Sequence, residues 1–115
     1  MSLPESATRY DIARTLGDTR ALTLTRRQRR GGPVVDQAGM SATLTLSDRA
    51  SGAALATLST ANAGIAPLDA SGVIAIDLGH AAYVALPAGA YSYRLDTVEA
   101  GETRPLLRGT WRVVA

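Results

Sequence analysis

Short segments in which apolar and polar residues alternate recur along the chain, with turn residues between them. The clearest is Val73–Leu78, where Ile74, Ile76 and Leu78 share one face. A period of two places alternate side chains on opposite faces of a β-strand, so each such segment is predicted to be a strand with one buried face. Short segments of this kind, at a spacing of roughly 8 to 12 residues, are typical of antiparallel sandwiches.

We expect an all-β chain of about seven or eight strands. The predicted strands in chain order are Thr8–Arg14, Ala21–Thr25, Ser41–Ser47, Ala53–Ser59, Val73–Leu78, Ala90–Val98 and Leu107–Val114. The alanines of Ala53–Ser59 could also support a helix, but its threonine and serine favour a strand. One short helical turn is expected near residues 79–86, because alanines replace the alternation there and Pro87 ends the segment.

The length of 115 residues predicts a single domain over residues 1–115, with residues 1–6 flexible. A chain of this size buries about two-thirds of the surface that it exposes when unfolded. It contains no phenylalanine and one tryptophan, so its core must be built mainly from aliphatic residues and tyrosines. It contains no cysteine, which excludes disulfides and thiolate metal sites.

The net charge of +2 is too small to make the whole surface a polyanion binder. No apolar run reaches the length of a membrane span, and the amino terminus lacks the charged-then-apolar order of a signal peptide. We therefore expect no membrane contact, and we also expect neither a metal ion nor another cofactor.

The densest charge lies in Arg26–Arg30, just before Gly31, Gly32 and Pro33. Crowded charge followed by glycine and proline predicts an exposed loop. Arginine forks bind carboxylates and phosphates, so the loop's arginines are candidate partner-binding residues: Arg26, Arg27, Arg29 and Arg30. An acidic protein partner is favoured over nucleic acid, because no aromatic residues interleave to stack on bases. A loop that binds nothing is the other interpretation.

The sequence offers no convincing catalytic set. His80 is the sole histidine, so a triad would need it together with Ser92 and Asp77, and no nucleophile elbow is present. Four further candidates are carboxylates that occur singly, interpreted as turn and surface residues: Asp48, Asp69, Asp77 and Asp96. Calcium sites and paired-acid mechanisms need clustered carboxylates. We therefore predict that the protein is not an enzyme.

The segment Leu86–Tyr93 has the pattern of a corner: a helical turn, a glycine reversal at Gly89, then two tyrosines on one face. In immunoglobulin-like sandwiches a tyrosine at such a corner packs inward and bonds its hydroxyl to the backbone just upstream. Tyr91 is predicted to be that residue. Tyr93 and Trp111 are predicted to fill the core beside it. The alternative is that these three rings form an exposed platform for sugars.

The carboxyl-terminal half, from Gly72 to Val113, resembles the small immunoglobulin-like domains of tailed-phage and prophage structural proteins, including the amino-terminal domain of baseplate upper proteins. The segments that carry the resemblance are Gly72–Ile76, Leu86–Leu95, the Gly101 turn and Leu106–Val113. The hairpin predicted over residues 41–59 matches loosely.

The resemblance implies an immunoglobulin-like antiparallel β-sandwich and a non-catalytic virion protein of the tail, baseplate or neck, assembled in the bacterial cytoplasm. Its partners would be other virion proteins and copies of itself, without nucleic acid. Two other functions stay open: a carbohydrate-binding module of a host-attachment device, and a nucleic-acid-binding accessory protein.

Overall fold

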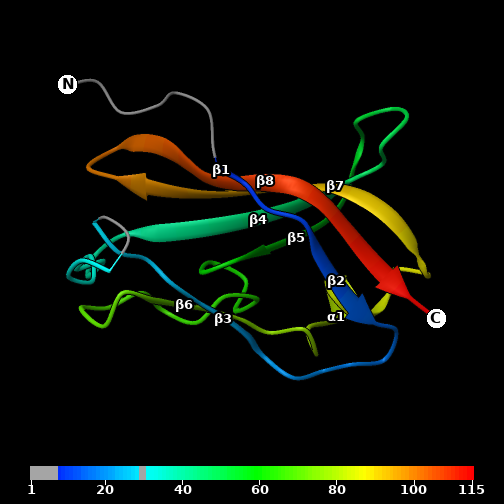
Figure 1. Ribbon diagram of the computed structural model, residues 1–115, viewed down its shortest axis with the longest axis horizontal. Coiled ribbons are helices and arrows are strands. Elements are labelled where there is room, and N and C mark those ends of the chain that lie inside the picture. Colours follow the sequence, from blue (N-terminus) through cyan, green and yellow to red (C-terminus); the bar gives the residue numbers. More distant parts are fainter. Residues whose placement is uncertain (1–7, 29–30) are drawn as a thin grey trace.

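The computed structural model describes residues 8–28 and 31–115, so the predicted flexibility of residues 1–6 lies outside the described residues. The described chain is mostly strand and forms two sheets (Figure 1). The elements are β1 (Thr8–Arg9), β2 (Ile12–Thr15), β3 (Leu22–Thr25), β4 (Ser41–Ser47), β5 (Ala54–Ser59), β6 (Val73–Ile76), α1 (Ala81–Val84), β7 (Gly89–Glu99) and β8 (Glu102–Val114).

The larger sheet has six strands in the order β1-β8-β7-β4-β5, and β2 also pairs with β8. This sheet is built around two antiparallel hairpins, β4–β5 and β7–β8, which are joined by the pairing of β4 with β7. The smaller sheet consists of β3 and β6, which lie together below the larger sheet in Figure 1. The all-β prediction is therefore confirmed, and the two sheets enclose the core between them.

Alternation along the central strands builds that core. In β4 the side chains of Ala42, Leu44 and Leu46 are buried, while the residues between them face outward. From the opposite sheet, β6 buries Ile74 and Ile76 in the same way. All of these residues belong to one hydrophobic cluster. The face predicted for Val73–Leu78 is confirmed, and β4 shows the same alternation.

Three aromatic rings occupy the centre of the cluster. Trp111 is fully buried and meets the rings of Tyr83 and Tyr93 edge-on, at centroid distances of 5.7 and 5.6 Å. Its indole Nε1–H donates to the Tyr83 hydroxyl at 3.0 Å. A buried N–H without an acceptor would be costly, so Tyr83 both packs against the indole and satisfies it.

The other two tyrosine hydroxyls of the core bond to the backbone. Tyr91 donates to the carbonyl of Pro87, which is the upstream bond that the corner pattern predicts. Tyr93 donates to the carbonyl of Tyr10, far away in the sequence. Tyr91, Tyr93 and Trp111 all lie in the core, so they do not form an exposed aromatic platform.

The helical turn expected near residues 79–86 is α1, which starts after His80. The His80 Nδ1 accepts from the backbone N–H of Ala82 at 3.1 Å, and its Nε2 lies 3.0 Å from the carbonyl oxygen of Asn62. The tautomer with hydrogen on Nε2 satisfies both contacts. The side chain that α1 buries is Tyr83.

The first predicted strand, Thr8–Arg14, is wrong in detail, because the structure splits it into β1 and β2 at Tyr10. Alternation along this segment places Tyr10 on the same face as Ile12, but Tyr10 is 53% exposed whereas Ile12 is buried. At this step the Tyr10 carbonyl oxygen would lie 2.5 Å from a Cβ at Gly109, so only glycine fits opposite it.

The prediction of a wholly antiparallel sandwich is also wrong for these two strands. Both β1 and β2 run parallel to β8, with Thr8 opposite Leu107 and Ile12 opposite Trp111. The other pairs among the named strands are antiparallel. Parallel neighbours need a long connection, and here almost the whole chain separates the first strands from the last.

The last strand is longer than the predicted Leu107–Val114, since β8 already begins at Glu102. Pro105 lies where β8 is paired with β7 alone, because the described pairing with β1 starts at Leu107. Among the described residues, one side of the strand at this proline is therefore without a strand partner, which suits a residue that has no backbone N–H. A register shift between Leu95 and Asp96 lies opposite it in β7.

The four-residue helix α1 falls far short of a membrane span. The described residues hold no helix with the length and hydrophobicity that crossing a membrane requires.

Replacing single tyrosines by phenylalanine removes one hydroxyl at a time and tests the hydrogen bonds of the core. Tyr83→Phe leaves the buried Trp111 N–H without its acceptor, so we expect the free energy of unfolding to fall by about 1–3 kcal/mol. Tyr91→Phe removes the corner bond and should cost about 0.5–1.5 kcal/mol. Tyr10→Phe is the matched control, because the Tyr10 side chain is exposed. It should change the free energy of unfolding by no more than about 0.5 kcal/mol. Equal losses in all three urea titrations would contradict this core.

The buried tyrosines also predict a loss of stability in alkali. Burial raises the pKa of the Tyr93 hydroxyl to about 12, and burial raises the pKa of Tyr83 as well. In the unfolded chain a tyrosine ionises near pH 10. Unfolding is therefore unaffected by these groups below about pH 10, and it becomes easier as the pH rises from about 10 to 12. Urea titrations across this range should show the decline, and Tyr93→Phe should flatten it.

Candidate binding groove

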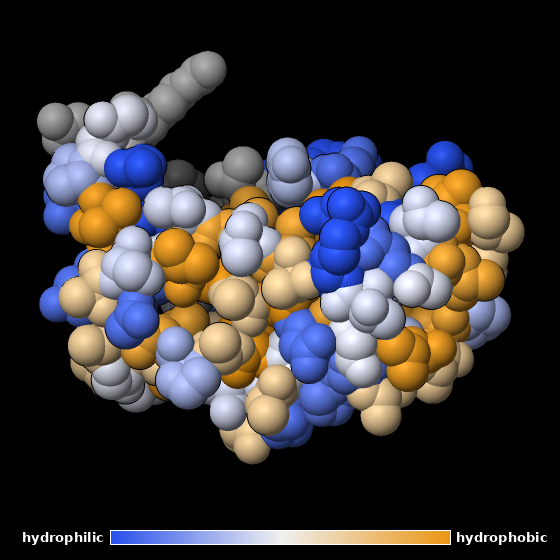
Figure 2. All heavy atoms as spheres, turned by 90° about the horizontal axis from the view of Figure 1, so that it is seen from below, coloured by the Kyte–Doolittle hydropathy of each residue, from blue (hydrophilic) through white to orange (hydrophobic). Residues whose placement is uncertain are grey.

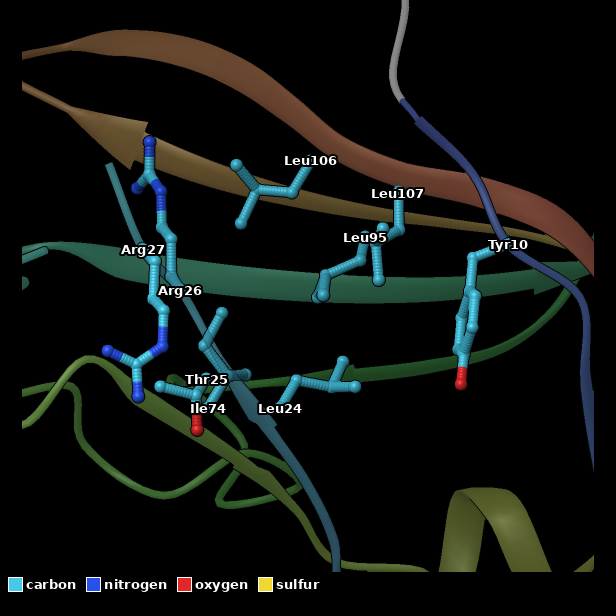
Figure 3. Close-up of a pocket in the computed structure, with 9 residues that line it drawn as sticks. All are labelled: Tyr10, Leu24, Thr25, Arg26, Arg27, Ile74, Leu95, Leu106 and Leu107. Carbon is cyan, nitrogen blue, oxygen red and sulfur yellow. The ribbon is translucent and has the colours of Figure 1, made fainter. Parts of the chain in front are cut away.

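A groove of about 390 Å³ opens between the edge of the β3–β6 sheet and the β7–β8 hairpin (Figure 3). Its lining residues are Tyr10, Leu24, Thr25, Arg26, Arg27, Ile74, Leu95, Leu106 and Leu107. Figure 3 shows the leucines of β7 and β8 facing Leu24, with the two arginines at one end and Tyr10 at the other. The groove is thus apolar along its length and cationic at one end.

The groove exists because β3 is an edge strand. Among the described residues its only strand partner is β6. Arg26 donates its backbone N–H to the carbonyl of Gly72, which fixes the hydrogen-bonding pattern: Leu22 and Leu24 bond toward β6. The backbone groups of Thr23 and Thr25 therefore point away from β6, toward the open side. No described backbone group pairs with them.

Both walls of the groove carry apolar side chains that the core covers only in part. Leu24 from β3 and Leu106 and Leu107 from β8 are partly buried and pack against the core cluster. Seen from the side of β3 and β6, apolar and polar residues are mixed over this face of the molecule (Figure 2). Covering apolar surface of this kind with another chain lowers the free energy, so it favours binding.

Arg26 differs from its predicted role as an exposed partner-binding residue. Its guanidinium forms an ion pair with Glu99, and both side chains are less than one-fifth exposed, at 16% and 17%. Glu99 also accepts from Arg104 Nε at 2.9 Å. The pair ties the end of β3 to the tip of the β7–β8 hairpin, so Arg26 acts within the fold. Sequence analysis did not single out Glu99, which lies 73 positions from Arg26.

Arg27 is exposed and lies at the mouth of the groove. In the described part of the predicted exposed loop, Arg27 forms an isolated bridge with Val34, and the backbone N–H of Gln28 donates to the carbonyl of Pro33. Arg27 Nη1 donates to the carbonyl of Gly32 at 2.9 Å, and a guanidinium has further N–H groups. The other two predicted binding residues, Arg29 and Arg30, lie outside the described residues.

The remaining candidates serve the fold locally. Asp48, Asp69 and Asp77 each accept a backbone N–H from two residues ahead, which stabilises a turn. Asp96, interpreted from the sequence as a surface residue, is buried and pairs with Arg94 at 2.8 Å. Among the described residues, no three histidine, aspartate or glutamate side chains gather into a possible metal site.

Among the described residues, no side-chain hydrogen bond joins the members of the hypothetical triad, and the contact between two of them is made by the backbone: the His80 N–H donates to the Asp77 carbonyl at 3.2 Å. His80 caps α1, and Asp77 accepts from the backbone of Gly79. Ser92 lies in β7, opposite Ser47 and Thr110 of the neighbouring strands.

Other arginines are paired as well. Arg20 Nη2 lies 2.9 Å from Asp18 Oδ2, and hydrogen bonds from Arg20 lower the pKa of Asp18 to about 2. Such pairs leave less free positive charge than the arginine content suggests.

Comparison with protein-family models found no matching family, and searches of curated proteins and of solved structures found no significant match.

The two described arginines of the groove are predicted to differ in their effect on stability. Arg26→Ala leaves Glu99 partly buried with one partner fewer, so we expect the free energy of unfolding to fall by about 1–3 kcal/mol. Arg27→Ala, the matched control at the adjacent exposed position, should change it by less than about 0.5 kcal/mol. Urea titration, which leaves the ionic strength unchanged, measures both. A larger loss for Arg27→Ala would show that the roles are reversed.

Proposed function

We propose that this chain is a non-catalytic, immunoglobulin-like module that acts by binding other proteins, as a structural component of a phage or prophage tail, baseplate or neck. It would be assembled in the bacterial cytoplasm, and its partners would include other virion proteins. The observation that carries the binding part is the edge of β3 that faces away from β6, where no strand of residues 8–28 or 31–115 pairs with it, beside an apolar groove. The virion part rests on the resemblance of residues 72–113.

The arrangement of strands supports the immunoglobulin-like classification. In that fold the C, F and G strands form one sheet, C′ joins it in variable-type domains, and B and E lie in the other sheet. The order β5-β4-β7-β8 fits C′-C-F-G, and the β3–β6 pair fits B and E. The corner bond from Tyr91 stands at the start of the strand that fits F. Trp111 departs from the antibody pattern, because it lies in the last strand.

The contents of the groove favour holding a chain over transforming a substrate. Leucine and isoleucine side chains bind through burial, and arginine adds directional bonds to carboxylates. An unpaired strand edge supplies a row of backbone donors and acceptors for another strand.

Two rival functions have less support. A sugar platform built from Tyr91, Tyr93 and Trp111 would require exposed rings, and these three are buried. A nucleic-acid site on the arginine cluster would lose Arg26, whose charge is paired with Glu99.

The genes beside this one test the virion proposal. We expect capsid or tail genes on the same stretch of genome, and the protein itself in purified phage particles by mass spectrometry. Flanking genes for metabolic enzymes alone, together with particles that lack the protein, would contradict the proposal.

A DNA-retention assay tests the nucleic-acid alternative. We expect retention on immobilised duplex DNA to be weak and unaffected by changing Arg27 and Arg29 together to alanine. Strong retention that falls steeply with salt and disappears in the double variant would count against protein binding.

A further inference from the structure

We infer that the groove receives an extended acidic segment of another protein, which adds to β3 as an antiparallel third strand. The segment carries apolar side chains at alternate positions and a carboxylate at its amino-terminal end. This inference rests on the proposed protein-binding function and names the chemistry of the partner.

The backbone of β3 supplies the first half of the recognition. Thr23 and Thr25 present their N–H and C=O groups to the open side, two residues apart. An antiparallel strand placed there would exchange two bonds with each of these residues. Antiparallel pairing is slightly more stable per residue than parallel pairing, which favours this direction.

The side chains of the groove supply the second half. In an antiparallel pair, directly opposite residues point to the same face of the sheet. The residue of the added strand that stands opposite Leu24 therefore points inward, toward the wall formed by Leu95, Leu106 and Leu107. A residue two positions along stands opposite Leu22 and also faces the core. The groove thus selects apolar side chains at every second position.

Charge at one end sets the direction. The lining contains Arg26 and Arg27 but no acidic residue. Behind the lining, Glu99 pairs with both Arg26 and Arg104. Glu102 stands opposite Glu99 at the tip of the hairpin. With Arg27, three arginines face two carboxylates, so positive charge remains in excess at this end. Arg27 follows the carboxyl-terminal end of β3, where an antiparallel strand begins. A carboxylate at the amino-terminal end of the segment would meet it.

A second copy of this chain fits less well through the same edge. Pairing β3 with β3 would place only the uncharged residues Leu22–Thr25 against each other. It would bring no carboxylate from that strand to Arg27. The charge of the groove therefore favours a different, acidic chain.

The test uses the full-length protein and synthetic peptides of about eight residues, the length of an edge strand. The probe peptide has two glutamates at its amino-terminal end, followed by alternating leucine and threonine. We expect its addition to shift the amide NMR signals of Thr23 and Thr25 and to slow their hydrogen exchange. Moving the glutamates to the carboxyl-terminal end should weaken binding by up to about fivefold.

Modified peptides test the backbone pairing with β3, and one pair of variants tests the recognition of charge. N-methylation of the amides that face β3 should weaken binding about tenfold, whereas N-methylation of the outward amides should not. Arg27→Glu should weaken binding of the glutamate peptide and strengthen binding of its lysine counterpart. Arg112→Glu is the control, because it makes the same charge change at an exposed side chain next to the buried Trp111 in β8.

Several outcomes would overturn the inference. Peptide contacts elsewhere, or equal effects of the two N-methylated peptides, would exclude strand addition. Signals of Thr23 and Thr25 that shift on dilution of the protein alone would identify a second copy as the occupant. Tighter peptide binding after removal of residues 1–7 would identify the chain's own beginning as the competitor.

The failure of this inference is distinguishable from failure of the proposed function. Phage gene neighbours and presence in particles without peptide binding at β3 would leave the virion role and remove the strand-addition mechanism. Peptide binding at β3, together with flanking genes for metabolic enzymes alone, would support strand addition and remove the virion role.

Discussion

The attachment of the first strands to β8, instead of to β3, is the constraint on which the rest of this structure depends. The Tyr93 hydroxyl holds the Tyr10 carbonyl, and Gly109 leaves room for that carbonyl beside β8. Because β1 and β2 pair with the larger sheet, the described part of the chain leaves β3 and β6 as the two strands of the smaller sheet. An open edge and a groove beside it follow directly.

The core and the groove are connected through the same strands. Trp111 and its tyrosine neighbours fix β7 and β8 against the rest of the fold. These strands line the groove with the partly buried Leu106 and Leu107 and the buried Leu95. At the far end, the pair between Arg26 and Glu99 holds β3 to the hairpin. The groove is therefore bounded by elements that the core makes rigid, which lowers the entropic cost of binding an extended segment.

Local sequence patterns predict most of the strands and turns of this fold. The inner faces of β4 and β6, the turn at α1 and the Tyr91 corner all depend on residues close together in the sequence, so alternation and turn chemistry were enough to predict them. The parallel pairing of β1 and β2 and the Arg26–Glu99 pair join distant residues, and no local pattern encodes them. A glycine inside a strand, Gly109, was the one available signal of a close approach. The groove itself is a gap between strands, so the sequence did not reveal it.

Hydrogen exchange of the free protein tests the central claim most directly. If β3 has one open edge, the amides of Thr23 and Thr25 exchange quickly with solvent, while those of Leu22 and Leu24, which bond to β6, exchange slowly. Two fast and two slow amides in alternation along β3 are the predicted result. Equal, strong protection at all four positions would show that a strand already covers this edge, and would contradict the account.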